Sequence, residues 1–247
     1  MTREKARTGH DESRSRPPEP GAPFNPVEEV IFRRRSVRFY QEKQVPEYLV
    51  RRVLEAGRFA PSAGNAQPWK FVVIQDHAMI EEMTREVVKV CRRVVGFADY
   101  TEPGRERREG VAKALQRFLP NMFHPIPLAA MKLIAQDKLG VWHGAPTVIS
   151  ILVDSRAPGK PFLDAGIAGQ NMVLAAHSFG LGTCWVSFIA PLGMIPGWRK
   201  RLGIHPPYKL ATSIALGYPR GNPDGLVPRE TKAVDWYRED GKTTVVF

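Results

Sequence analysis

A basic segment near the start of the chain holds the densest group of side chains suited to binding phosphate. Arg33, Arg34, Arg35, Ser36 and Arg38 all lie within this one stretch. Arginine suits a phosphate dianion because its planar guanidinium makes paired, charge-assisted hydrogen bonds. A solvated basic turn would have the same composition. The segment alone therefore leaves an anion site and an ordinary surface turn both open.

A second segment, residues 60–69, reads Ala-Pro-Ser-Ala-Gly-Asn-Ala-Gln-Pro-Trp and precedes an apolar run. It combines small residues with a hydroxyl and two amides. Small residues let a backbone approach a flat ligand closely, and loops often carry binding residues. A plain connection between a helix and a strand remains the alternative interpretation.

Other chemistries find little support in the residue types. The six histidines and two cysteines show no metal-ligand spacing, and no Gly-x-Ser-x-Gly sequence occurs. The net charge of +11 would suit a nucleic-acid binder or a protein for anionic ligands. The arginines are scattered, however, and often alternate with glutamate, as in residues 105–109. We therefore expect no nucleic-acid partner.

Composition also bears on the compartment. Cys91 and Cys184 are too few for a disulfide framework. No apolar run approaches a membrane span, and residues 1–23 lack the apolar centre of a signal peptide. We expect a cytoplasmic protein without a membrane partner.

The elements that must position these segments can be predicted from periodicity and from prolines. A short helix should open at Pro26, and a second should run from Pro46 to about Ala60. A strand is expected over 69–75 and a helix over 78–95. Residues 97–140 read as an inserted helical lid, whose last helix covers about 128–139.

The second half of the chain alternates strands with one long helix. The pattern predicts strands over 146–154, 183–188 and 210–216, and a β-prone end over 243–247. A helix rich in small residues should cover 162–179, and Gly180 should end it. Residues 1–23 read as a disordered tail, and residues 24–247 as one domain with the lid at about 97–140.

Five motifs in order resemble the nitroreductase family of flavoproteins. They are residues 34–38, residues 60–69, Asp164 to Asn171, Gly180 to Trp185 and Leu216 to Pro219. The resemblance runs from about residue 27 to 240 and leaves the lid uncovered. It implies an α+β sandwich with a central mixed, mainly antiparallel sheet flanked by helices. It also implies an interlocked homodimer that binds FMN at the subunit interface.

The resemblance also implies roles for individual residues. Arg34, Arg35 and Ser36 would contact the FMN phosphate and ribityl chain, and Arg38 would approach N1 and O2 of the flavin. The backbone of the strand end would line the isoalloxazine, the loop would come from the partner subunit, and a late basic residue would add a phosphate contact. The residues carried over for these three roles are Val186, Ser187 and Phe188 for the strand end, Pro61, Ser62, Ala63 and Asn65 for the loop, and Arg229 or Lys232 for the late contact.

The lid is where we expect the acceptor to be recognised. Aromatic and hydrogen-bonding side chains gather there, and they would suit a flat molecule stacked on a flavin: Asn121, Met122, Phe123, His124 and Trp142. Packing of the lid onto the body would use the same residue types.

The expected function is hydride transfer from NAD(P)H through flavin N5 to an organic acceptor such as a nitroaromatic or a quinone. Three alternatives stay open. Two are other reduced-FMN chemistries of the family, reductive dehalogenation and flavin fragmentation. The third is a flavin-binding protein without catalytic activity.

Overall fold

The computed structural model describes residues 21–98, 110, 117, 125–221 and 229–246. Two compact units divide the chain, residues 1–33 and residues 34–247. The described part of the first unit contains helix α1 (Pro26–Arg33), which begins at the predicted proline and buries none of its residues. All that follows concerns the second unit.

The second unit is built around a four-stranded sheet with the order β1-β2-β4-β3. Its strands are β1 (Trp69–Ile74), β2 (Thr147–Asp154), β3 (Gly182–Val186) and β4 (Tyr208–Gly217). All neighbouring strands pair antiparallel. Ser36 adds a parallel bridge to Thr183 at the β3 edge. The predicted fold, a mixed but mainly antiparallel sheet flanked by helices, is confirmed.

Strand β2 explains the layered packing of the unit. Seven of its eight residues are buried, because helices cover both faces of the sheet. Val148 and Leu152 belong to one apolar core, and Ile149, Ile151 and Val153 to the other. Successive strand residues point to opposite faces, so a single strand supplies both cores.

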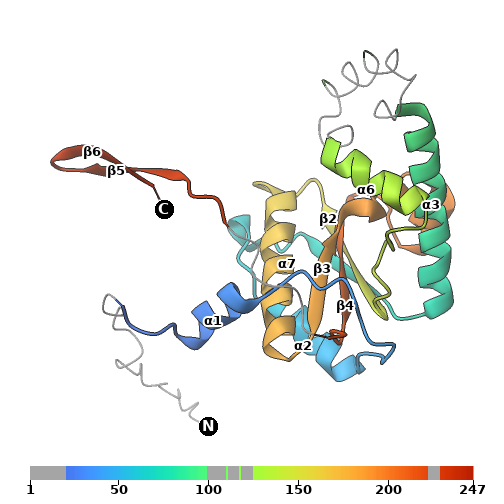
Figure 1. Ribbon diagram of the computed structural model, residues 1–247, viewed down its shortest axis with the longest axis horizontal. Coiled ribbons are helices and arrows are strands. Elements are labelled where there is room, and N and C mark those ends of the chain that lie inside the picture. Colours follow the sequence, from blue (N-terminus) through green and yellow to red (C-terminus); the bar gives the residue numbers. More distant parts are fainter. Residues whose placement is uncertain (1–20, 99–109, 111–116, 118–124, 222–228, 247) are drawn as a thin grey trace, which may run out of the picture. The chain divides into compact units, whose positions relative to one another are not determined.

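One face of the sheet carries α2 (Glu47–Arg58) and α7 (Pro161–Ser178) (Figure 1). Helix α7 approaches the sheet closely because it has glycine where it crosses β3. A Cβ at Gly169 would lie 2.2 Å from the Trp185 ring. The helix ends as predicted, since Gly180 has a φ of +74° and donates to the His177 carbonyl at 3.0 Å.

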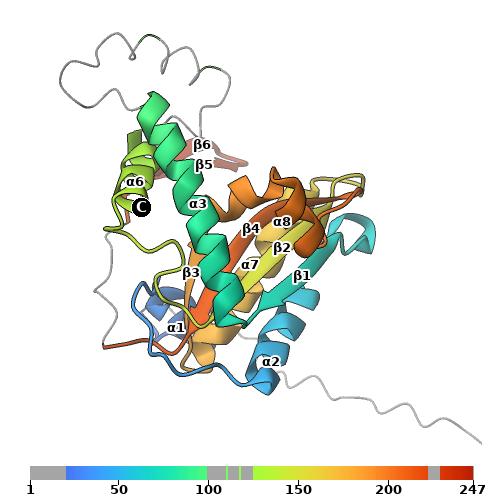
Figure 2. The same ribbon diagram turned by 90° about the vertical axis from the view of Figure 1, so that its right-hand side faces the viewer.

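The opposite face carries α3 (His77–Ala98) and α6 (Pro125–Ala135), which lie side by side in both views (Figures 1 and 2). The 3₁₀ segment η3 (Ser187–Gly193) and the short helix α8 (Pro196–Arg201) complete this layer. Helix α6 begins and ends earlier than the predicted 128–139 helix. Strand β3 ends at Val186, two residues before the predicted end, because the chain turns into η3 there.

A separate hairpin closes the chain, formed by β5 (Ala233–Arg238) and β6 (Gly241–Val246). Its strands pair only with each other in the part of the chain that the structure describes. Most of its residues are exposed, including Trp236 and Tyr237. The sequence predicted β6 but not β5.

Candidate functional site

The basic segment lies along the edge of the sheet as an extended strap, residues 34–41. The Val37 backbone N–H donates to the Thr183 carbonyl at 2.9 Å. The Val37 side chain is buried against Gly182. A Cβ added to Gly182 would lie 2.7 Å from a Val37 methyl carbon. Ser36 and Arg38, on either side of this anchor, are exposed. The strap is therefore held by its apolar residue and presents its polar neighbours outward.

The Tyr40 side chain fixes the far end of the strap. It is buried, and its hydroxyl donates to the Val37 carbonyl at 2.8 Å. Burial is the main cause that raises the pKa of this phenol above its ordinary value, so the hydroxyl remains a donor. The Tyr40 ring also packs on Gly217: a Cβ added to Gly217 would lie 2.8 Å from a carbon of that ring. Tyr40 was not among the site residues predicted from the sequence.

Positive charges converge at the first residues of the strap. Burial, and then the charges of Arg229 and Arg35, lower the pKa of Arg34 below its ordinary value. Burial and the charges of Arg34 and Arg35 likewise lower the pKa of His177, at the end of α7. Guanidinium groups that repel one another in this way form a ready site for a dianion. His177 belongs to this cluster and was not among the site residues predicted from the sequence.

The two late basic residues separate in the structure. Arg229 lies close enough to lower the pKa of Arg34. Lys232 is exposed and forms an ion pair with Glu230. The geometry therefore favours Arg229 as the late residue of the anion cluster.

A different set of groups surrounds Arg38. Its charge acts on the buried thiol of Cys184, but burial outweighs it and raises the thiol pKa. It also acts on His143, whose pKa is lowered first by burial and then by Arg38. His143 has a φ of +55°, which is uncommon for a residue other than glycine. Arg38 thus supplies a second positive charge further along the strap, and the neighbouring His143, whose pKa is lowered, stays neutral near pH 7.

The predicted strand-end residues lie where β3 passes into η3. Val186 is buried, and its carbonyl accepts a 2.7 Å hydrogen bond from the Ser213 hydroxyl. Ser187 is exposed and Phe188 half-buried at the first turn of η3. The backbone at Ser187 is therefore accessible at the point where the strand ends.

The loop at 61–68 is tightly folded. The Gln67 N–H donates to the Ser62 hydroxyl at 2.9 Å. Positive φ values at Gly64 (56°), Asn65 (53°) and Gln67 (46°) give it sharp turns. Pro61 and Asn65 are exposed. A Cβ added to Gly159 would lie only 2.5 Å from the Cβ of Ala63. Small residues at both positions permit this close approach.

The strap and the loop lie at opposite ends of the sheet. At the strap end, Gly182 pairs with Gly217 and Leu216 pairs with Thr147, the first residue of β2. At the loop end, the N–H of Asp154, the last residue of β2, donates to the Pro68 carbonyl at 2.8 Å. Strands rise about 3.3 Å per residue, so β2 separates these ends by about 23 Å. One chain therefore does not bring the two predicted half-sites together.

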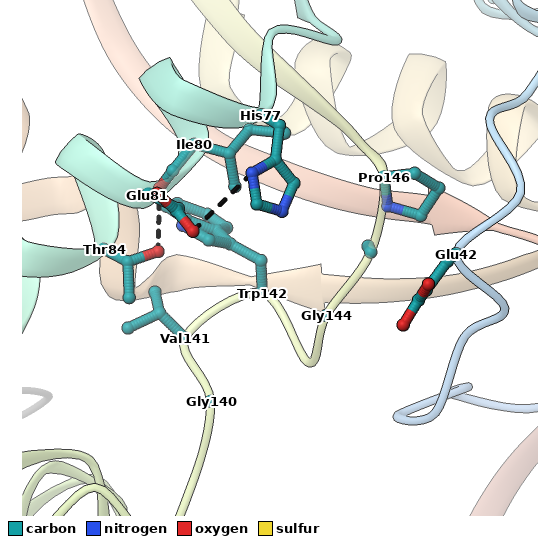
Figure 3. Close-up of a pocket in the computed structure, with 11 residues that line it drawn as sticks. Glu42, His77, Ile80, Glu81, Thr84, Gly140, Val141, Trp142, Gly144 and Pro146 are labelled. Atoms are coloured by element: carbon teal, nitrogen blue, oxygen red, sulfur yellow. Dashed lines mark hydrogen bonds and ion pairs between the residues drawn. The ribbon is translucent and has the colours of Figure 1, made fainter.

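Four of the predicted acceptor-binding residues, 121–124, lie outside the described residues. Trp142 is described and is only 2% exposed, so it is a wall of the core rather than an open lid residue. It lines a cavity of about 450 Å³ together with Glu42, His77, Glu81 and Thr84 (Figure 3). His77 Nδ1 lies 3.6 Å from a Glu81 carboxylate oxygen, and the Thr84 hydroxyl donates to the Ile80 carbonyl at 2.8 Å.

Neither a metal cluster nor a membrane-spanning helix occurs in the described ranges. Within them, no group of three or more histidine, cysteine or acidic residues is arranged to hold a metal ion. No helix among them is both long and apolar enough to cross a membrane.

Comparison with known proteins identifies the family. The model of the nitroreductase family matches residues 31–218. A 4-nitrobenzoate reductase from Nocardioides sp. is 32% identical over 208 residues, covering 76% of this chain and 78% of that protein. An NADH dehydrogenase from Thermus thermophilus is 29% identical over 228 residues, covering 84% and 94%.

A solved structure agrees with these sequence matches. A nitroreductase with bound FMN from Bacteroides fragilis superposes with a TM-score of 0.57 at 25% identity, covering 85% of this chain and 95% of that one. The fold and the ordered motifs define a nitroreductase-type oxidoreductase. The chain belongs to the nitroreductase family, as the sequence predicted.

Proposed function

We propose that this protein is an FMN-dependent reductase that oxidises NAD(P)H and reduces an organic acceptor. The observation that carries the proposal is the basic track along the strap. Three arginines converge at one end beside His177, and Arg38 supplies a second positive charge further along, beside His143. A phosphorylated flavin has a dianion at one end and an electron-accepting ring at the other. The FMN bound in the similar nitroreductase structure from Bacteroides fragilis supports FMN as that ligand.

Each residue of the track has a definite task in this proposal. Arg34, Arg35 and Arg229 hold the phosphate, and Ser36 contacts the phosphate or the ribityl chain. Arg38 would lie beside N1 and O2 of the ring, where its positive charge would favour an electron-rich flavin and raise the reduction potential. The strap cannot slide because Val37 and Tyr40 anchor it.

The end of β3 positions the reactive edge of the ring. The backbone N–H of Ser187 or Phe188 would donate a hydrogen bond there, and the bond from the Ser213 hydroxyl to the Val186 carbonyl fixes the peptide that carries the Ser187 N–H. FMN supplies the hydride-carrying chemistry, and no protein side chain needs to act as acid or base. The protein orients the two substrates and excludes water from the ring face.

We propose further that the enzyme is a homodimer with a composite site. The 61–65 loop of one chain would complete the flavin site formed by the strap of the other, since one sheet holds these segments at opposite ends. One observation supports a partner. The β5–β6 hairpin leaves Trp236 and Tyr237 exposed, although isolated two-stranded hairpins are rarely stable.

The nature of the acceptor is supported by the relatives. The similarity to a 4-nitrobenzoate reductase favours a nitroaromatic, and a quinone has the same flat, electron-poor character. A cytoplasmic location agrees with a reaction that consumes NAD(P)H.

Anaerobic stopped-flow mixing tests the reductase proposal. Purified holoprotein should lose its flavin absorbance when mixed with NADH or NADPH, and a nitroaromatic should restore it. A flavin that neither nucleotide bleaches would identify a binding protein without reductase activity. Mass spectrometry after aerobic turnover should recover intact FMN; a benzimidazole product would identify flavin fragmentation instead.

A further inference from the structure

An apolar cavity opens between α3, α6 and η3, apart from the basic track. Its volume is about 480 Å³, within the range of roughly 300–1,000 Å³ typical of small-molecule sites. Helix α3 contributes Cys91 and Val94, helix α6 contributes Ala130 and Met131, and η3 contributes Phe188. The cavity is thus walled by three elements whose positions the core fixes.

The chemistry of this cavity contrasts with the rest of the molecule. None of the described residues that line it carries a charge, although the chain as a whole has a net charge of +11. Burial raises the pKa of the Cys91 thiol to about 11, so no thiolate forms there near neutral pH. Ser187 supplies the one side-chain hydroxyl among the described lining residues. A charged ligand would lose its hydration here and gain no ion pair.

The position of the cavity connects it to the reaction. Ser187 and Phe188 belong both to its wall and to the strand end that the proposed function sets beside the reactive edge of the flavin. A molecule that reacts at that edge can therefore extend a substituent between α3 and α6. The cavity that Figure 3 shows has two carboxylates and a histidine on its wall and lacks this contact with η3.

We propose that the cavity selects the electron acceptor: it receives the apolar substituent of an uncharged aromatic or quinone acceptor and disfavours acceptors with a carboxylate. This inference rests on the proposed function. Apolar substituents gain affinity from every carbon that leaves water, whereas a carboxylate meets no cation in this wall.

Steady-state assays of the holoenzyme can measure the selection. Nitrobenzene, 4-butylnitrobenzene and 4-nitrobenzoate would be compared as acceptors by the rate of NAD(P)H oxidation. Burial of the four butyl carbons should raise kcat/KM by about a hundredfold over nitrobenzene, and 4-nitrobenzoate should fall below nitrobenzene. Equal values for the three acceptors, or preference for the carboxylate, would overturn the inference.

Two variants of Ala130 locate the effect in this cavity. Ala130→Phe fills the space and should remove most of the preference for the butyl compound. Ala130→Lys adds a cation and should raise the ratio of kcat/KM for 4-nitrobenzoate to that for nitrobenzene by about tenfold. Ala129, on the same helix, is exposed and does not line the cavity, so Ala129→Phe and Ala129→Lys are the matched controls.

The outcomes separate this inference from the proposed function. If NAD(P)H does not bleach the flavin of the unmodified enzyme, the proposed function fails. If bleaching occurs but the Ala130 and Ala129 variants rank the three acceptors alike, the reductase assignment survives and the cavity has no part in selection.

Discussion

At the scale of single residues, the structure distinguishes two basic side chains that look alike in the sequence. Arg229 influences Arg34, whereas Lys232 is paired with Glu230. We expect Arg229→Gln to weaken FMN binding about tenfold to a hundredfold, because hydrogen bonds to charged groups are worth about 1.5–3 kcal/mol. Lys232→Gln, which removes the same charge, should change binding little. Titration monitored by flavin fluorescence measures both constants, and equal losses would refute the assignment.

His177 should make FMN binding depend on pH. In the free protein its pKa lies below the ordinary value because of burial and the charges of Arg34 and Arg35. A bound phosphate dianion would raise this pKa, so FMN binding takes up a proton. The contribution to affinity is full below the free-protein pKa and is lost as pH rises through the bound pKa.

A comparison of two proteins isolates this effect, since the FMN phosphate itself titrates near pH 6. The dissociation constant would be measured from pH 5.5 to 8 for the unmodified protein and for His177→Asn. The unmodified protein should lose more affinity across this range. Parallel profiles would show that the histidine does not respond to the phosphate.

In the absence of FMN, the same shift has the opposite consequence for folding. A histidine whose pKa is depressed in the folded state stabilises the fold above its unfolded pKa. That stability is lost as pH falls towards the folded pKa. The free protein should therefore unfold more easily at pH 5.5 than at pH 7.5, and bound FMN should reduce the difference.

At the scale of elements, close packing between α7 and the sheet depends on Gly169. A methyl group there would lie 2.2 Å from the Trp185 ring and 3.0 Å from Ile151. Gly169→Ala should lower the free energy of unfolding by about 1–3 kcal/mol, the usual cost of overpacking. Gly96→Ala in α3 is the control: its added methyl meets no atom within 4 Å, and alanine favours helix by up to about 1 kcal/mol. Denaturant titration compares the two.

Elements could be predicted from the sequence where a proline or glycine marks a helix end or where an apolar run marks a strand. Pro26, Pro46 and Gly180 mark helix ends through their own backbone chemistry, and the apolar run from Trp69 marks a strand. Short elements such as α8 and η3 were missed, because six or seven residues give too little periodicity. β5 was missed because charged residues interrupt its apolar side chains.

The site could be predicted only where a local motif carried it. The strap arginines could be proposed as site residues because they are adjacent in the sequence. His177 was not predicted beside the strap arginines, nor His143 beside Arg38, because only folding brings α7 and the 140–145 loop next to the strap. Trp142 was predicted as a candidate acceptor-binding residue, and its burial favours the packing alternative; an aromatic residue in a loop gives no sign of its burial.

At the scale of the whole molecule, the separation of strap and loop makes a mixing experiment decisive. Arg34→Ala should disable the strap, and Asn65→Trp should block the loop, each inactivating a homodimer. When the two variants are mixed at random, about half of the dimers contain one chain of each. In such a dimer one of the two sites combines an intact strap with an intact loop. About one quarter of the activity of the unmodified enzyme should therefore return. No recovery after co-refolding would place both half-sites within one chain.

The burial of both cysteines has a practical consequence for labelling. Cys91 and Cys184 are 2% and 4% exposed, and burial raises both thiol pKa values, so neither forms a reactive thiolate readily. The native protein should resist iodoacetamide and maleimide dyes, as intact mass spectrometry would show. A single cysteine introduced on the surface would then be the preferred attachment point for a fluorophore or spin label. The unmodified sequence thus already serves as a low-background host for spectroscopic probes.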